Sequence, residues 1–79
     1  MNRLEVTDGL TSIFRKTFVD EALVITDEMT ANDVDKWDSL THMILISEIE
    51  NAFAIKFKLK DLNKMKNVGD MIDIILTKL

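Results

Sequence analysis

The chain has 79 residues, no cysteine and one histidine, which excludes disulfides and a structural zinc site as sources of stability. Its 14 acidic and 10 basic residues give a formal charge of −4 and a pI of about 4.8, which argues against non-specific nucleic-acid binding. It contains no apolar run near the roughly 20 residues of a membrane span, and its first residues lack the order of a signal peptide. We therefore expect one small domain, residues 1–79, that is monomeric and cytoplasmic.

The first apolar stripe predicts a helix that ends near Phe18, because its members recur at helical spacing: Val6, Leu10, Ile13, Phe14 and Phe18. A connection of about 20 residues follows, from Val19 to Asp38. Loops of this length without regular structure are uncommon in compact domains and usually have a function. This one leads directly to the pair Asp38–Ser39.

The second helix begins at that pair, since either Asp38 or Ser39 can cap the free N–H groups of a first turn. Its apolar positions continue to Phe53. We expect the inner stripe to consist of Leu45, Ile49 and Phe53, with Met43 and Ile46 on its flanks. Ile44 widens the apolar surface beyond what one buried face needs.

Residues 55–60 alternate apolar and lysine side chains, the period of a half-buried strand, but the sequence offers no second strand to pair with. We interpret the segment as an extended connector with Ile55, Phe57 and Leu59 pointing inward, followed by a short helical turn at residues 61–65. Asn67 then caps a last helix. The predicted fold is all-α: a small four-helix bundle with three main helices, one short helix and a long loop between the first two helices.

The charges are segregated along the chain. Seven acids lie between residues 20 and 38, opposed only by Lys36, and five lysines lie between residues 56 and 66, opposed only by Asp61. One interpretation is that both stretches are simply surface segments whose charges are solvated by water. Alternatively, one or both help to select a partner, since complementary charges speed encounter and exclude wrong partners.

Few residues offer catalytic or metal-binding chemistry. An EF-hand loop starting at Asp33 fails, because its sixth and twelfth positions hold Asp38 and Ile44 in place of glycine and glutamate. His42 follows Ser39 by one helical turn and suggests a hydrolase pair, but no third group or oxyanion hole accompanies it. We interpret His42 as an exposed polar residue.

Ser39 is the strongest candidate for a functional residue. By itself, a serine after an aspartate at a helix start is a cap worth about 1 kcal/mol. Here it follows a long acidic loop that ends in Trp37. At a helix N-terminus its hydroxyl projects from the bundle, and the first-turn N–H groups can receive an anionic phosphate.

The run Trp37–His42 resembles the phosphopantetheine attachment motif of acyl carrier proteins. The second and last helices also resemble those of that family, in the right order and spacing, at Leu45, Ile46, Ile49, Glu50, Phe53, Asn67, Val68, Gly69, Asp70, Ile72 and Ile75. The resemblance covers most of the chain, from about Ile13 to Leu76.

The resemblance implies a carrier that performs no catalysis itself. A phosphopantetheinyl transferase, using Mg²⁺ and coenzyme A, would join 4'-phosphopantetheine covalently to Ser39, with Asp38 recognised by that transferase. The terminal thiol would hold an acyl chain as a thioester and present it to acyl-activating or acyl-transferring enzymes, in fatty acid, polyketide or related specialised biosynthesis.

Departures from the family pattern favour a free-standing specialised carrier. Trp37 stands where many fatty-acid carriers have glycine, the second helix has few acids, and lysines occupy a stretch that is commonly acidic. We expect partner enzymes to bind Leu40, Thr41, Ile44 and Glu48. The alternative is a helical interaction module that keeps the fold and is never modified.

Overall fold

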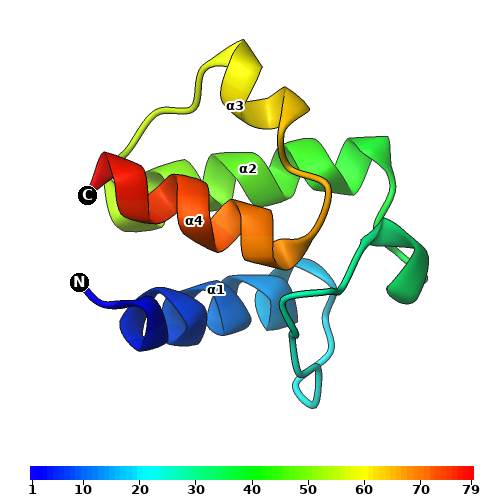
Figure 1. The fold of residues 1–79 in the computed structure, drawn as a ribbon. Helices are drawn as coiled ribbons and strands as arrows, with labels where there is room; N and C mark the ends of the chain where they lie inside the picture. Colours follow the sequence, from blue (N-terminus) through cyan, green and yellow to red (C-terminus); the bar gives the residue numbers. More distant parts are fainter.

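The computed structural model describes residues 1–79 and consists of helices and loops, with no strand. The main helices are α1 (Arg3–Thr17), α2 (Ser39–Phe53) and α4 (Val68–Lys78), and the short helix is α3 (Leu59–Asn63) (Figure 1). A 3₁₀ turn, Ala31–Asp33, lies within the long loop between α1 and α2. The predicted all-α fold, with three main helices and one short one, is confirmed.

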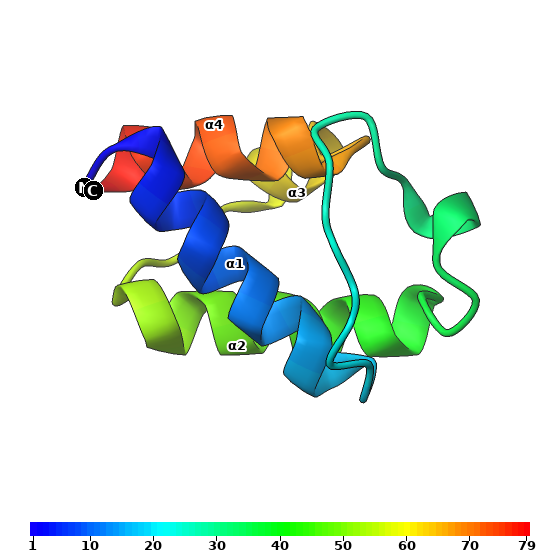
Figure 2. The ribbon, with the colours of Figure 1, turned by 90° about the horizontal axis from the view of Figure 1, so that it is seen from below.

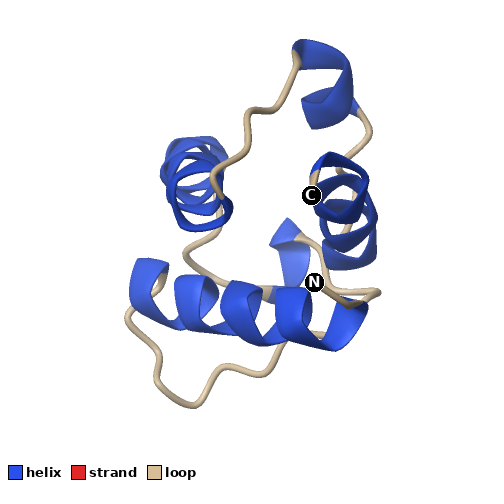
Figure 3. Ribbon diagram, turned by 90° about the vertical axis from the view of Figure 1, so that its left-hand side faces the viewer, coloured by secondary structure: helices blue, strands red, loops and turns tan.

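Helix α1 packs against both α2 and α4, which run in the same direction (Figure 2). Seen from the side, α2 and α4 stand end-on with α1 across them, and α3 lies at the far edge (Figure 3). The two chain ends lie close together at one end of the bundle. The start of α2, and with it Ser39, lies at the opposite end, beside the long loop (Figures 1 and 2).

A single cluster of 14 buried apolar residues forms the core. The stripe of α1 is buried as its spacing predicts, with Leu10 and Phe14 completely inaccessible to solvent. Burial of such a side chain contributes about 1.5–3 kcal/mol relative to leaving it exposed. Gly9 allows α1 to approach α2 closely, since a Cβ there would lie 3.0 Å from the ring of Phe53.

The long loop is anchored to the bundle at its middle. The carbonyl oxygens of Asp27 and Met29 accept hydrogen bonds from the N–H groups of Gly69 (2.9 Å) and Val68 (3.0 Å), at the start of α4. Ile25 is buried in the core, and Arg3 pairs with Asp27 at 2.8 Å. The loop is therefore fixed to α1 and α4 before it reaches α2.

Two sequence expectations in the connector were wrong. The short helix covers residues 59–63 and not 61–65, because the Asp61 carboxylate accepts the Lys58 N–H at 2.8 Å and so occupies the third helical position. Leu59 consequently begins a helix and leaves the alternating pattern, and its side chain is 74% exposed. Ile55 is buried and Phe57 half-buried, as expected.

No helix of the structure is both long and apolar enough to cross a membrane.

Candidate functional site

Asp38 fixes the start of α2. Its backbone is extended, and its Oδ1 accepts the Thr41 N–H at 2.9 Å while the Thr41 hydroxyl accepts the Asp38 N–H at 2.8 Å. The hydrogen bond from the Thr41 N–H holds the pKa of Asp38 below its ordinary value. This reciprocal cap makes Asp38 the last residue before the helix and Ser39 the first residue within it.

Ser39 has an exposed side chain, and its hydroxyl makes no hydrogen bond within the protein. It lies at the positive end of α2, where the helix dipole and the first-turn N–H groups favour a bound phosphate. The chain has two other serines, Ser12 and Ser47, and both lie inside helices. Among the serines, only Ser39 combines exposure with a helix N-terminus.

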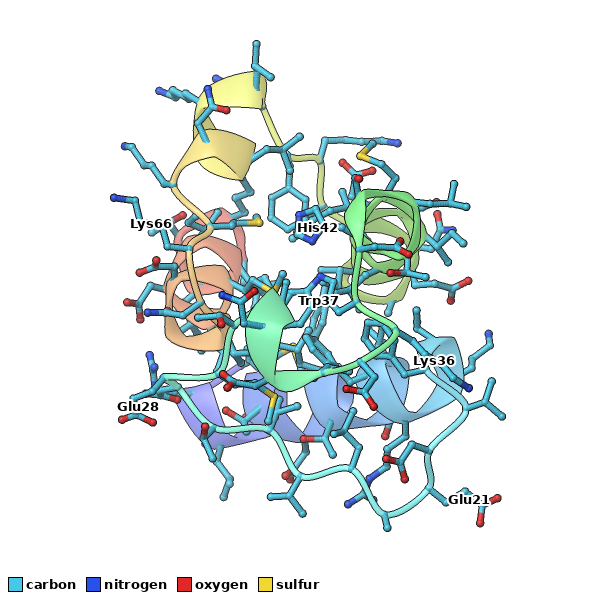
Figure 4. The ribbon with its side chains drawn as sticks, turned by 90° about the vertical axis from the view of Figure 1, so that its right-hand side faces the viewer. Glu21, Glu28, Lys36, Trp37, His42 and Lys66 are labelled. Atoms are coloured by element: carbon cyan, nitrogen blue, oxygen red, sulfur yellow. The ribbon has the colours of Figure 1, made fainter.

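Trp37 is the buried residue that holds this helix start in place. Its ring is 8% exposed and meets the ring of Phe14 edge-on, with centroids 5.2 Å apart. Its Nε1–H donates to Nδ1 of His42 at 3.0 Å, and the two rings lie edge to edge and nearly coplanar, with an interplanar angle of 17°. Figure 4 shows Trp37 and His42 together in the middle of this end of the bundle.

His42 is half-buried, so the expectation of an exposed histidine was wrong. Sequence spacing could not reveal that Trp37, five residues earlier, would cover it. Because Nδ1 accepts the indole N–H, the neutral imidazole carries its proton on Nε2. Burial lowers the pKa of His42, which favours this neutral form.

This arrangement gives Ser39 no general base. The structure has no hydrogen bond between Ser39 and His42, and Nδ1 of His42 is taken by Trp37. Nε2, which carries the proton, cannot accept one from a serine hydroxyl. The geometry therefore does not support a hydrolase in which His42 activates Ser39.

A cleft of about 430 Å³ opens beside Ser39. It combines apolar side chains with one acid and one cation, and its lining residues are Ala31, Trp37, Asp38, Ser39, His42, Met43, Met65 and Lys66. Met65 and Lys66 come from the segment between α3 and α4, a placement that no sequence pattern indicated. The cleft gives a flexible chain attached at Ser39 an apolar surface to lie against.

The four residues expected to bind partners all lie on α2, but their surroundings differ. Leu40 is 74% and Ile44 48% exposed. The Thr41 hydroxyl is engaged in the cap and also donates to the Lys36 carbonyl at 2.7 Å, while Glu48 is half-buried and pairs with Lys16 at 3.4 Å. Leu40 and Ile44 are thus the two whose side chains are free for a partner.

Met43 was expected on the flank of the buried stripe, and that expectation was wrong because its side chain is 57% exposed. Leu40, Met43 and Ile44 are spaced by three and four residues and share one face of α2. The sequence predicted the centre of the buried face correctly, since Leu45 and Ile49 are completely buried, but it did not show how far that face extends.

The structure is thus a small helical bundle with one exposed serine at the start of α2. No family model matches the chain, and no curated protein sequence matches it. Among solved structures, the solution NMR structure of holo acyl carrier protein from Geobacter metallireducens is similar to it, with a TM-score of 0.88 and 51% sequence identity. The similarity covers 92% of this chain and 84% of that one. This chain belongs to the acyl carrier protein family.

The residues present fit the prosthetic group of a holo carrier, which is 4'-phosphopantetheine. An uncommitted hydroxyl at a helix N-terminus suits a phosphodiester, and the adjoining cleft has room and apolar surface for the rest of the arm. Lys66 provides the only positive side chain in the cleft, opposite the negative charge of Asp38.

Proposed function

We propose that this chain carries acyl intermediates as thioesters on a 4'-phosphopantetheine arm attached to Ser39, within a single carrier domain of residues 1–79. The observation that carries the proposal is the position of Ser39: exposed, first in α2, and uncommitted to any hydrogen bond. Family membership and the adjoining cleft support it.

In this proposal, partner enzymes catalyse the bond-forming steps and the chain itself catalyses none. A transferase, with Mg²⁺ and coenzyme A, forms the phosphodiester on the Ser39 oxygen, and the thiol at the end of the arm then takes up the acyl group. Asp38 contributes by fixing the start of α2 through its cap with Thr41 and by presenting a carboxylate beside Ser39 that a transferase recognises.

We propose that partner enzymes dock on α2 through Leu40 and Ile44, with Thr41 and Glu48 at the margin of the contact. The exposed apolar stripe that these two residues form with Met43 supports a partly apolar interface close to the arm. Apolar side chains that are exposed together in this way are typical of interaction sites. The cargo belongs to fatty acid, polyketide or related specialised biosynthesis.

Incubation with coenzyme A, Mg²⁺ and a broad-specificity phosphopantetheinyl transferase tests the attachment. Intact-mass measurement is expected to show one phosphopantetheine added to the native chain and none added to Ser39→Ala. Ser47→Ala is the matched control, because Ser47 is also an exposed serine of α2, and it is expected to be modified normally. Modification of Ser39→Ala would contradict the proposal.

A test in the organism that encodes the chain separates this function from the alternative of an unmodified interaction module. If the chain is a carrier, Ser39→Ala abolishes its function while the variant remains folded. If the chain is an interaction module, Ser39→Ala functions like the native chain. Circular dichroism of the variant establishes that the helices are intact.

A further inference from the structure

Half of the basic residues of this acidic chain lie on one edge of the molecule. We call the exposed residues Lys56, Lys58, Leu59, Lys60, Lys64 and Lys66 the lysine edge. The basic residues that form ion pairs in the structure are Arg3, Lys16 and Lys78. None of the five lysines of the edge is among them.

Asp61, the one acid within the stretch, does not neutralise the lysine edge. Its Oδ2 lies 2.8 Å from Nζ of Lys78, and the two side chains are only 13% and 19% exposed. It also accepts the backbone N–H of Lys58. The charge of Asp61 is therefore matched chiefly by Lys78. Among the lysines of the edge, Lys60 acts on Asp61 electrostatically, but none of the five forms an ion pair with it.

The lysine edge also exposes an apolar side chain at its centre. Leu59 is 74% exposed and lies in sequence between Lys58 and Lys60. A protein interface typically combines an apolar contact of this kind with a charged rim that orients the partner.

The edge is continuous with the proposed attachment site. Lys66 lines the same cleft as Ser39, together with Met65. Figure 4 shows Lys66 projecting outward from the segment before α4, in the half of the molecule that contains His42, whereas Glu21 and Glu28 lie in the other half. The lysine edge therefore adjoins the cleft at Lys66.

We propose that the lysine edge is a docking surface for an acidic patch on the enzyme that loads the acyl group onto the arm, with Leu59 as its apolar contact. This inference rests on the proposed carrier function and specifies the charge of the partner. An anionic membrane is a poorer match, because α3 has five residues and one exposed leucine and the whole chain has a charge of −4.

The test uses the triple variant Lys58→Gln, Lys60→Gln, Lys64→Gln in the organism that encodes the chain. Mass spectrometry of the isolated protein gives the fraction with an arm, and a time course of samples taken after its expression is induced gives the rate at which the arms acquire an acyl group. Arm attachment is expected to be unchanged, while the initial rate of acylation falls roughly tenfold, as for the loss of electrostatic steering. Lys16→Gln with Lys36→Gln, which removes charges elsewhere, is the control and is expected to be loaded normally.

The outcomes separate this inference from the carrier function. A native chain without an arm refutes the carrier function itself. A triple variant that is folded, modified and acylated at the native rate overturns the inference alone. Two further results also overturn it: binding of the native chain to phosphatidylglycerol-containing vesicles, and salt-sensitive self-association through its acidic loop.

Discussion

The contact between Trp37 and His42 links the end of the long loop to α2 through one hydrogen bond. The indole can only donate, so the bond requires a neutral imidazole with Nδ1 free to accept. Protonation of His42 puts a hydrogen on Nδ1 and removes the acceptor. One of the contacts that hold the helix start at Ser39 in place therefore depends on the charge of His42.

Stability is expected to fall as the pH is lowered from about 7.5 to about 5.5. The pKa of His42 is lowered in the folded state, so below about 6.5 the unfolded chain binds the proton first and is favoured. The contribution of neutral His42 to the free energy of unfolding is therefore fully present above about pH 6.5 and is lost progressively as the pH falls below that value. Asp38 and Asp61, whose pKa values are also lowered, stay ionised throughout this range.

Urea unfolding across this pH range measures the effect. His42→Phe keeps an aromatic ring against Trp37 but has no titrating group, so its stability is expected to be lower at neutral pH and to change less with pH. If the native chain and His42→Phe show the same pH dependence, the assignment of the effect to His42 is wrong.

Val19 has a backbone conformation that suits glycine. It follows α1 with φ of 52°, in the left-handed region, and its N–H and that of Asp20 close the helix end on the carbonyls of Lys16 and Arg15. The side chain is 84% exposed, so little packing depends on it. Val19→Gly is expected to raise the free energy of unfolding by about 1 kcal/mol, the lower end of the left-handed penalty for a residue with a Cβ.

Val24→Gly is the matched control, because Val24 is also an exposed valine of the loop but has no positive φ. At this position glycine relieves no strain and only increases the conformational entropy of the unfolded chain, so the free energy of unfolding is expected to fall. If chemical denaturation shows both variants to be destabilised equally, the backbone of Val19 is not strained.

At the scale of the elements, the docking of the long loop onto α4 determines where α2 begins. Gly69 permits this contact, since a Cβ there would lie 3.1 Å from the carbonyl oxygen of Asp27 and 3.2 Å from its Cβ. Backbone atoms cannot move aside as cheaply as a side-chain end. The loop would have to shift as a unit, and Trp37 and Ser39 with it.

Gly69→Ala is therefore expected to lower the free energy of unfolding by about 1–3 kcal/mol, the range for overpacking, although alanine is the better helix former. Gly9→Ala is the control. Its new methyl would meet the ring end of the half-buried Phe53, which can shift, so the loss is expected to be smaller. A Gly69→Ala chain as stable as the native one in thermal unfolding would contradict the proposed tight contact.

The periodic elements were predictable from sequence, and the contacts between them were not. The spacing in α1 and the Asn67 cap of α4 were sufficient to predict those helices correctly. The short helix was misplaced by two residues because the sequence did not show that Asp61 would cap from inside the helix. The sequence predicted that Asp38 and Ser39 lie at the start of α2, as the structure shows, whereas the burial of His42 and the approach of Met65 and Lys66 depend on tertiary packing.

At the scale of the whole molecule, the functional features lie at one end of the bundle. Ser39, its cleft and the exposed stripe of Leu40, Met43 and Ile44 adjoin one another, and the chain ends lie at the opposite end (Figure 1). In the proposed function, the bundle holds the Ser39 hydroxyl at a fixed, accessible position. Whether that hydroxyl bears the arm is the central claim.

Tandem mass spectrometry of the protein isolated from the organism that encodes it tests this claim most directly. Trypsin is expected to release residues 37–56 as one peptide, which contains both Ser39 and Ser47. We expect fragmentation to place phosphopantetheine on Ser39, with an acyl group on part of the population. An unmodified Ser39 in protein that is active in its cell, or an arm found on Ser47, would contradict the account.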